Sequence, residues 1–434
     1  MSVTLAGLIG LIVLIILLLF RMPIAFCMGL VGFLGYGFVA GFDASLSNLG
    51  LIPYSSVANH SMAVLPLFIL MGCVASQARI SGDIYKTTYS WLGQIRGGLA
   101  MATVVGCGGF AAVSGSTIAT SAAMGMVALP EMRKYNYDPG LATGSIAAGG
   151  TLGILIPPSM AFILYAMLTE ESVGKLFMAG IFPGVLEIAF YMAVIYVLCL
   201  HKPQMGPAGP RTTFKQKIKS LRGSWSMLTL FVLVMGGIYL GVFTPTEAGA
   251  IGAFGAFVIG FAMRRLSRQN IVESFLQTGQ VTAMIMLLFV GATIFSSFLT
   301  VTRIPFTLAD FIAGLAVNRY IVLSIVLIFY IIIGCFLDIP AIIILTVPII
   351  FPVIMALGFN PIWYGVLMVR VSEIGAITPP VGISCYVISG VTKVPLATVF
   401  RGVIPFLIAD ILQIILLAAF PIISIWLPTV MKGA

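Results

Sequence analysis

Two matching segments that contain glycine and paired prolines are the clearest candidates for chemistry in this chain. The first is Gly153-Ile154-Leu155-Ile156-Pro157-Pro158, and the second, 222 residues later (375 − 153), is Gly375-Ala376-Ile377-Thr378-Pro379-Pro380. Because proline has no N–H, each pair removes the helical hydrogen bonds that the carbonyls of Gly153, Ile154, Gly375 and Ala376 would accept. Unpaired carbonyls in lipid favour a site for a hard cation such as Na⁺. A proline kink repaired by neighbouring side chains is the alternative interpretation.

The composition predicts the kind of protein that holds these segments. Of 434 residues, 60% are hydrophobic and 8% are charged, and the mean hydropathy is +1.15. Apolar runs of this length must be helices in a bilayer, since lipid offers the backbone no hydrogen-bond partners. We therefore predict an all-α polytopic membrane protein. The net charge of +9 resides in short loops between spans, so it indicates orientation rather than a nucleic-acid partner.

The repeat extends beyond the paired prolines and predicts two halves with one plan. Residues 1–200 contain scaffold spans within 1–78, an interfacial arm at 79–96, a re-entrant hairpin at 97–134, a broken helix at 138–168 and a span at 176–200. Residues 225–434 contain scaffold spans within 225–300, an arm at 303–319, a hairpin at 320–357, a broken helix at 361–391 and a span at 403–428. A basic linker, 201–224, joins the halves. Five crossings in each half make the second half inverted relative to the first.

The distribution of basic residues predicts the orientation. With both termini in the periplasm, most of the 22 Lys and Arg residues fall on the cytoplasmic side, including those of the linker 201–224. This arrangement agrees with the positive-inside rule. It places the tips of the two hairpins near the middle of the membrane, entering from opposite sides.

Several polar residues at these elements are candidates for binding. Ser114 and Ser116 lie at the first hairpin tip, and Gly334 and Asp338 lie at the second. An acid such as Asp338 within the membrane serves either as an ion ligand or as a hydrogen-bond partner that stabilises the tip. Arg370 either pairs with Glu373, one helical turn away, or recognises an anionic substrate. The further candidates for substrate contacts are Ser116 and Ser159. Glu247 is interpreted as the end of a span, and Asp410 has no assigned role.

Five segments together resemble a known family. They are Ser-Gly-Ser at 114–116, Gly-Ile-Leu-Ile-Pro-Pro-Ser at 153–159, Gly-Cys-Phe-Leu-Asp at 334–338, Pro-Ile-Ile-Phe-Pro at 348–352 and Ile-Thr-Pro-Pro-Val-Gly at 377–382. With them the chain resembles the large membrane subunit of tripartite ATP-independent periplasmic (TRAP) transporters of the bacterial inner membrane. The resemblance implies a Na⁺-driven elevator. It also implies two partners: a small four-helix membrane subunit as a separate chain, and a soluble periplasmic protein that delivers an organic anion.

The resemblance also implies where the ions bind. The first Na⁺ site maps to Ser114, Ser116, Gly153 and Ile156. The second maps to Gly334, Gly375, Thr378 and Val381, with Asp338 beside them.

The expected function is therefore Na⁺-coupled uptake of a small carboxylate or sulfonate. A stand-alone sodium/anion symporter without a binding protein is the main alternative. An intramembrane enzyme is a remote one, since the sequence shows no catalytic dyad or nucleotide-binding motif.

Overall fold

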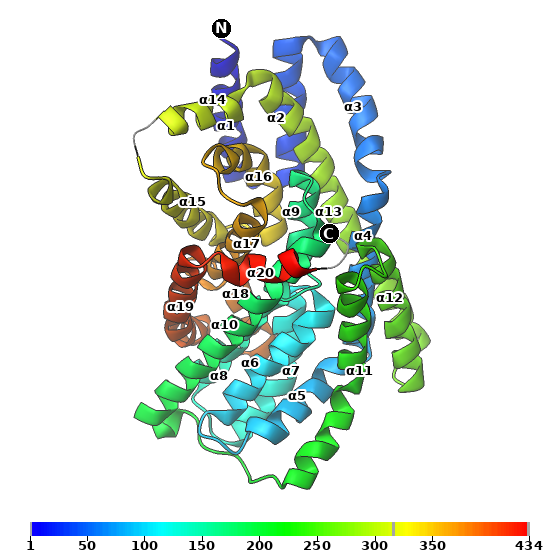
Figure 1. Cartoon of the computed structure of the whole chain (residues 1–434), viewed down its shortest axis with the longest axis vertical. Helices are drawn as coiled ribbons and strands as arrows, with labels where there is room; N and C mark the ends of the chain where they lie inside the picture. The colour runs from blue at the N-terminus through cyan, green and yellow to red at the C-terminus, as the bar shows by residue number, and fades with distance from the viewer. Residues whose placement is uncertain (1, 315–316, 432–434) are drawn as a thin grey trace.

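The computed structural model describes residues 2–314 and 317–431, and this part of the chain is α-helical without strands (Figure 1). Eight of its helices are long and apolar enough to cross a membrane. The predicted all-α, multi-span fold is confirmed. Residues 315 and 316 of the predicted second arm, and residue 1 and residues 432–434 at the termini, lie outside the described residues.

The first half is built of α-helices joined by short turns. They are α1 (Val3–Leu19), α2 (Ile24–Ala40), α3 (Phe42–Val57), the short 3₁₀ turn η1 (His60–Ala63), α4 (Val64–Gln77), α5 (Ile80–Leu92), α6 (Gly98–Ser114), α7 (Thr117–Lys134), α8 (Pro139–Leu155), α9 (Met160–Thr169) and α10 (Val173–His201). Helix α5 corresponds to the predicted arm, α6 and α7 to the hairpin, and α8 and α9 to the broken helix.

The second half follows after the 3₁₀ turn η2 (Pro203–Met205). It contains α11 (Phe214–Tyr239), α12 (Pro245–Ala262), α13 (Arg268–Thr302), α14 (Ile304–Gly314), α15 (Arg319–Gly334), α16 (Ile339–Ala356), α17 (Pro361–Ile377), α18 (Ile383–Thr392), α19 (Leu396–Ala419) and α20 (Ile422–Val430). Here α15 and α16 form the hairpin, and α17 and α18 form the broken helix. The inverted relation of the two halves stays a prediction.

Two element boundaries differ from the prediction. Helix α11 begins at Phe214, inside the predicted linker, because Thr213 and Gln216 form a reciprocal capping box that starts the helix early. The predicted last span at 403–428 is interrupted, since α19 ends at Ala419 and α20 starts at Ile422. Pro421 at this junction has no N–H to continue the helix.

The first hairpin turns sharply because of its sequence. Gly115 has φ +59°, a left-handed conformation that glycine adopts without strain. The next residue, Ser116, caps α7 by accepting a hydrogen bond from the Ala119 N–H at 3.4 Å. The tip is thus a two-residue connection from which α7 starts afresh.

The two helix breaks lie at the paired prolines, as predicted. Helix α8 ends at Leu155, and α9 starts after Ser159, whose hydroxyl accepts from the Phe162 N–H at 3.3 Å. Helix α17 ends at Ile377, and α18 starts after Gly382, which has φ +57°. Each break therefore leaves a new helix N-terminus in the interior of the molecule.

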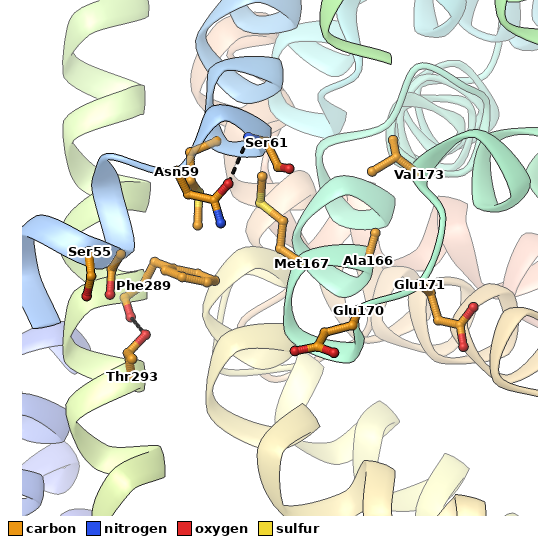
Figure 2. Close-up of a pocket in the computed structure, with 12 residues that line it drawn as sticks. Ser55, Asn59, Ser61, Ala166, Met167, Glu170, Glu171, Val173, Phe289 and Thr293 are labelled. Atoms are coloured by element: carbon orange, nitrogen blue, oxygen red, sulfur yellow. Dashed lines mark hydrogen bonds between the residues drawn. The ribbon is translucent and has the colours of Figure 1, made fainter. Parts of the chain in front are cut away.

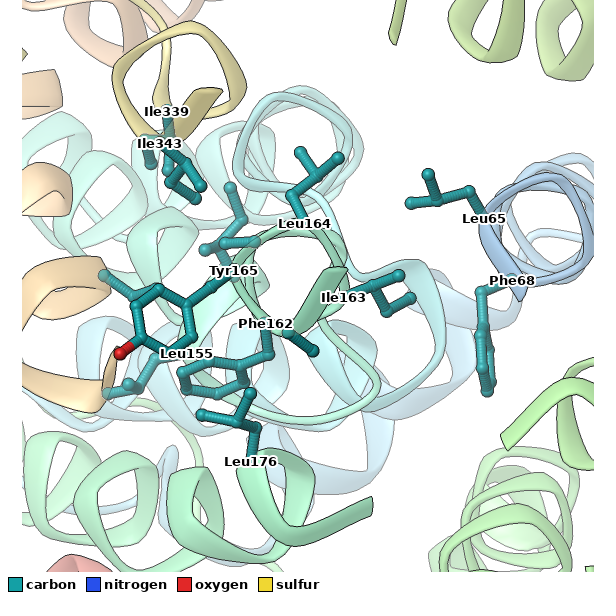
Figure 3. Close-up of a cluster of buried hydrophobic side chains, with 14 of the residues drawn as sticks. Leu65, Phe68, Leu155, Phe162, Ile163, Leu164, Tyr165, Leu176, Ile339 and Ile343 are labelled. Carbon is teal, nitrogen blue, oxygen red and sulfur yellow. The ribbon is translucent and has the colours of Figure 1, made fainter. Parts of the chain in front are cut away.

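The half-helix α9 lies at the centre of the larger apolar core. Figure 3 shows its side chains Phe162, Ile163, Leu164 and Tyr165 pointing to different neighbours. Those neighbours include Leu65 and Phe68 of α4, Leu176 of α10, and Ile339 and Ile343 of α16. Because α9 is packed on all sides, the break that precedes it has a fixed position relative to the second hairpin.

Candidate functional site

A cavity of about 380 Å³ brings together the hairpin tips and the helix breaks. One wall, here called the half-helix wall, is formed by Ser114, Ser116, Thr117, Ile118, Ala119, Ala122, Ile154, Met160, Asp338, Ile339, Pro340, Ala376, Ile383 and Ser384. The other, the scaffold wall, is formed by Ile69, Gly72, Cys73 and Ser76 of α4 and by Gln277, Gln280, Val281, Met284 and Ile285 of α13. Segments more than 200 residues apart in the sequence thus share one cavity, as the repeat suggested.

Four helices begin at this cavity. Thr117, Met160, Ile339 and Ile383 are the first residues of α7, α9, α16 and α18, and each of them lines the cavity. A helix N-terminus presents unpaired N–H groups and a partial positive charge, so it attracts an anion. Among the lining residues there is no Lys, Arg or His, and Asp338 is the one charged side chain.

Close backbone contact holds the first hairpin tip against the first break. A Cβ atom added to Gly153 would lie 2.5 Å from the Ser116 carbonyl oxygen. A Cβ on Gly115 would lie 2.7 Å from the carbonyl oxygen of Pro158. These positions require glycine, because any side chain would push the two backbones apart. The contact gathers several backbone carbonyls at the first predicted ion site.

The second tip meets the second break in the same way. A Cβ on Gly375 would lie 2.4 Å from the Cα of Gly334, and a Cβ on Gly334 would lie 3.0 Å from the Ser372 carbonyl oxygen. The first and second halves therefore use glycine at corresponding places to pack a hairpin against a broken helix.

The donor set at both contacts suits Na⁺ better than a transition metal. It consists of carbonyl and hydroxyl oxygens, which hard monovalent cations accept. Within residues 2–314 and 317–431, no group of three His, Cys, Asp or Glu side chains is arranged to hold a metal. The Thr378 hydroxyl donates to the Ile374 carbonyl at 2.6 Å, which leaves its oxygen lone pairs available.

One predicted feature of the second break is wrong. The Gly375 carbonyl is not free, because it accepts a hydrogen bond from the Thr378 N–H at 3.1 Å. The last turn of α17 tightens to reach a donor three residues ahead instead of four. A carbonyl has two lone pairs, so Gly375 can still contact a cation, though as an already hydrogen-bonded group.

The predicted site residues divide into two groups. Ser114, Ser116 and Asp338 line the cavity. The remaining predicted ion ligands do not line it and lie at the hairpin contacts or within the breaks: Gly153, Ile156, Gly334, Gly375, Thr378 and Val381. Asp338 occupies the N-cap position of α16, yet its carboxylate makes no capping hydrogen bond. The Asp338 carboxylate therefore does not cap α16, and its role as an ion ligand or as a hydrogen-bond partner that stabilises the tip stays a prediction.

Ser159 is placed differently from the prediction. It is fully buried, does not line the cavity, and its hydroxyl caps α9. A substrate contact for Ser159 is not supported by this arrangement, since the hydroxyl is already used to satisfy the helix N-terminus.

Arg370 also lies away from the cavity, in a sealed ionic cluster. Its guanidinium contacts Glu187 and Glu373 at 3.3 Å each, and it pairs with Asp410. All four side chains are 0% exposed. Gln413 accepts from Arg370 Nε at 2.8 Å, and the Tyr191 hydroxyl lies 3.5 Å from its second terminal nitrogen.

The cluster joins three helices, α10, α17 and α19, through one arginine. The predicted Arg370–Glu373 pair is observed, and Asp410 gains a partner that the sequence did not indicate. Three carboxyl groups already surround the single guanidinium, so this geometry does not support Arg370 as a ligand for an anion.

Two polar positions that line the cavity were missed in the sequence. Gln277 and Gln280 of α13 line the cavity, although both were assigned to an ordinary span. Their polarity within an apolar helix, one turn apart, is the signal that could have identified them. Glu187, in the middle of α10, was missed for a similar reason, as it was treated as part of a plain span.

A second cavity, of about 510 Å³, lies at the other end of α9 (Figure 2). Ser55 and Asn59 line it from the end of α3, Thr293 from α13, and Glu170 and Glu171 from the turn after α9. Among its lining residues there are two acids and no Lys, Arg or His. Unlike the first cavity, it contains no residue of a hairpin tip or of a helix break, so it does not hold the predicted site residues.

Comparison with known proteins identifies the family. Residues 11–423 match the family model described as "Tripartite ATP-independent periplasmic transporter, DctM component". The chain belongs to this family. It is therefore a large permease of the TRAP transporter type and a multi-pass membrane protein.

Curated relatives cover most of the chain. It is 38% identical over 385 residues to the C4-dicarboxylate TRAP transporter large permease protein DctM of Pseudomonas aeruginosa, with 88% of this chain and 90% of that protein covered. It is 33% identical to the isethionate TRAP transporter permease protein DctMQ of Oleidesulfovibrio alaskensis, covering 92% of this chain and 62% of that protein. It is 31% identical to the sialic acid TRAP transporter large permease protein SiaM of Vibrio cholerae, covering 87% and 88%.

A solved structure shows a similar fold. The Alcanivorax borkumensis YdaH transporter, described as having an unusual topology, matches with a TM-score of 0.65 and covers 87% of this chain and 89% of that one. Its sequence identity of 13% means that the likeness concerns the fold alone.

Proposed function

We propose that this permease takes up a small organic anion, a carboxylate or a sulfonate, together with Na⁺. The observation that carries the proposal is the shared cavity, in which both hairpin tips and both helix breaks face one scaffold wall. Half-helix N-termini attract an anion, while the carbonyls and hydroxyls behind them suit a monovalent cation. The relatives named for C4-dicarboxylate, isethionate and sialic acid support this chemistry.

The arrangement explains why ion and substrate binding would be coupled. The predicted ion ligands Gly153 and Gly375 are the residues that touch the hairpin tips, and the same tips line the cavity. A cation that holds a tip against its broken helix would organise the helix N-termini that meet the anion. Each ligand would then bind more tightly in the presence of the other.

An elevator movement fits the two walls. The half-helix wall would move as one body along α4 and α13. Where the walls touch, a Cβ on Gly72 of α4 would lie 2.8 Å from the Ser114 carbonyl oxygen, so this contact depends on a small residue. A small residue at this contact lets the backbones of the two bodies approach closely.

Two partners complete the proposed system. The family is described as tripartite, and we expect a separate small membrane subunit and a periplasmic protein that delivers the anion. The basic segment 201–224, which includes the first turns of α11, would face the cytoplasm, with both termini in the periplasm, following the positive-inside rule.

Uptake by purified protein in liposomes tests the proposal, with and without the periplasmic binding protein and under an imposed Na⁺ gradient. Asp338→Ala and Thr378→Ala are expected to raise the Na⁺ concentration for half-maximal uptake by about tenfold, the effect of losing a hydrogen bond or ligand to a charged group. Thr300→Ala is the matched control, because Thr300 makes the same hydrogen bond within its helix, to Ser296 at 2.8 Å, away from the cavity.

Two outcomes of this experiment would contradict parts of the proposal. Unchanged Na⁺ activation in both variants contradicts the ion sites. Uptake that needs no periplasmic protein favours the stand-alone symporter.

A further inference from the structure

The scaffold wall of the cavity carries two side-chain amides without protein partners. Gln277 and Gln280 lie one turn apart on α13, both line the cavity, and both are exposed to it. No hydrogen bond from either amide to the described part of the chain is found. The polar residues one and two turns earlier on α13 have partners in the protein. Asn270 donates to Gln77 at 3.0 Å, and Glu273 accepts from Gln77 at 3.2 Å and from Gln269 at 3.1 Å.

The opposite wall carries an unpartnered hydroxyl. Thr117 is 4% exposed, its Oγ1 makes no hydrogen bond to the described residues, and it lines the cavity at the first turn of α7. A buried hydroxyl without a partner is unfavourable by about 1–3 kcal/mol, so a ligand oxygen in the cavity that accepts from Thr117 would relieve this cost. The half-helix wall thus offers the unpartnered Thr117 hydroxyl and several helix N-termini, and the scaffold wall offers two amides.

We propose that Gln277 and Gln280 form a subsite for the far end of a bifunctional anion. In this arrangement, which rests on the proposed function, the charged end of the ligand lies at the N-terminus of α7 and accepts from Thr117. The second end, an oxygen function such as a carboxylate or hydroxyl, lies between the amides of α13. The ligand class is therefore a small carboxylate or sulfonate that carries another oxygen function at its opposite end.

The type of side chain supports this assignment. An amide both donates and accepts, so it can hydrogen-bond either a carboxylate oxygen or a hydroxyl. Two amides at i and i+3 project from one helix face about 5–6 Å apart, which lets both reach one terminal group. A lysine or arginine here would bind a second charge more strongly, but no cationic side chain lines the cavity.

The position on α13 adds a consequence for selectivity. The scaffold wall meets the ligand only when the two walls face each other as they do in this structure. Gln277 and Gln280 are thus specificity-determining residues that act on one conformation of the transporter, and they are not part of the ion sites.

Ligand-induced thermal stabilisation of the purified protein, measured in Na⁺, tests the subsite. The probes are succinate and isethionate, which carry a second oxygen function, and butyrate and ethanesulfonate, which lack it. We expect the wild type to bind the first pair about tenfold more tightly or better, the effect of hydrogen bonds to a charged or polar group. Gln277→Ala and Gln280→Ala are expected to remove this preference, and Thr117→Val to weaken the binding of all four probes.

Gln269→Ala is the matched control, because Gln269 lies on the same helix and bonds to Glu273 rather than lining the cavity. Retention of the preference in both cavity variants overturns the subsite while leaving the proposed function intact. Equal binding of all four probes by the wild type likewise overturns the subsite and leaves the proposed function intact. Absence of binding by every probe, with the protein folded, overturns the subsite together with the proposed function.

Discussion

The Arg370 cluster and the cavity differ in their charged groups and in their access to solvent. The cluster contains one guanidinium and three carboxyl groups, and all of them are sealed from solvent. The cavity is open, contains no cationic side chain, and presents helix N-termini, hydroxyls and amides instead. The contrast teaches that an intramembrane arginine is not by itself a sign of an anion site. Here the arginine is held by three acids inside the fold, and the cavity that we propose for the substrate is lined by neutral polar groups and by Asp338.

The two regions also differ in the helices that they join. Glu187, Arg370 and Asp410 tie α10, α17 and α19 together. These helices flank the second break, so the cluster holds the body whose half-helices end at the cavity. Charge in the cluster therefore holds helices together, whereas the polar groups of the cavity face open space, where we propose that they bind the ligand.

Removing the arginine gives the largest expected effect. In Arg370→Gln, three buried carboxyl groups lose their common partner, and breaking a buried ion pair in this way costs about 3–5 kcal/mol. We expect the variant to be poorly recovered in folded form and to unfold at a much lower temperature in detergent, as measured by size-exclusion chromatography and thermal unfolding.

Glu187→Gln provides the control for this prediction. It keeps the size of the side chain and removes one of three acids, so it is expected to unfold near the wild-type temperature. Wild-type stability and uptake in Arg370→Gln would show that the cluster does not hold the fold, and would remove the contrast with the cavity.

A smaller effect is expected where the second tip packs on the second break. Gly375→Ala places a methyl group 2.4 Å from the Cα of Gly334, so two backbones must separate. Overpacking of this kind costs about 1–3 kcal/mol. Because the tip also lines the cavity, we expect a large loss of uptake together with only a small decrease in the unfolding temperature.

Gly390→Ala is the matched control for Gly375→Ala. A Cβ on Gly390, in α18, meets nothing within 4 Å, and alanine is the better helix former by about 1 kcal/mol. This substitution is expected to leave uptake unchanged and to stabilise the helix slightly. Equal uptake in the two variants would contradict the assignment of Gly375 to the tip contact.

The sequence predicted the elements of the site better than the roles of single charged residues. The repeat of Gly153 and Gly375 located both breaks, because proline chemistry is local and acts within a few residues. The hairpin tips at Ser116 and Asp338 were located for the same reason, since turn and cap residues act on their own backbone.

The partners of charged residues were harder to predict, because they depend on contacts across the fold. Arg370 pairs with Glu187, 183 residues earlier in the chain (370 − 187), and with Asp410, which no local pattern connects to it. Gln277 and Gln280 could be assigned to the cavity only from the position of α13 opposite the hairpin tips. Local chemistry therefore predicted where the helices break. Tertiary packing determines which polar groups find hydrogen-bond or ion-pair partners within the protein.

The ion pair between Asp83 of α5 and Arg265, in the turn after α12, provides the smallest expected effect. It resembles the Arg370 cluster in type but not in surroundings, since the Arg265 side chain is 35% exposed and that of Asp83 is 13% exposed. Pairs with access to water contribute about 0–1 kcal/mol and weaken with added salt. Asp83→Asn is therefore expected to lower the free energy of unfolding by about 1 kcal/mol or less, with the difference from wild type shrinking as NaCl is raised.

The effect of Arg370→Gln on the free energy of unfolding is, in contrast, expected to be independent of salt, because no ions reach a cluster that is 0% exposed. A salt-independent effect of several kcal/mol for Asp83→Asn would show that burial does not account for the difference between the two ion pairs.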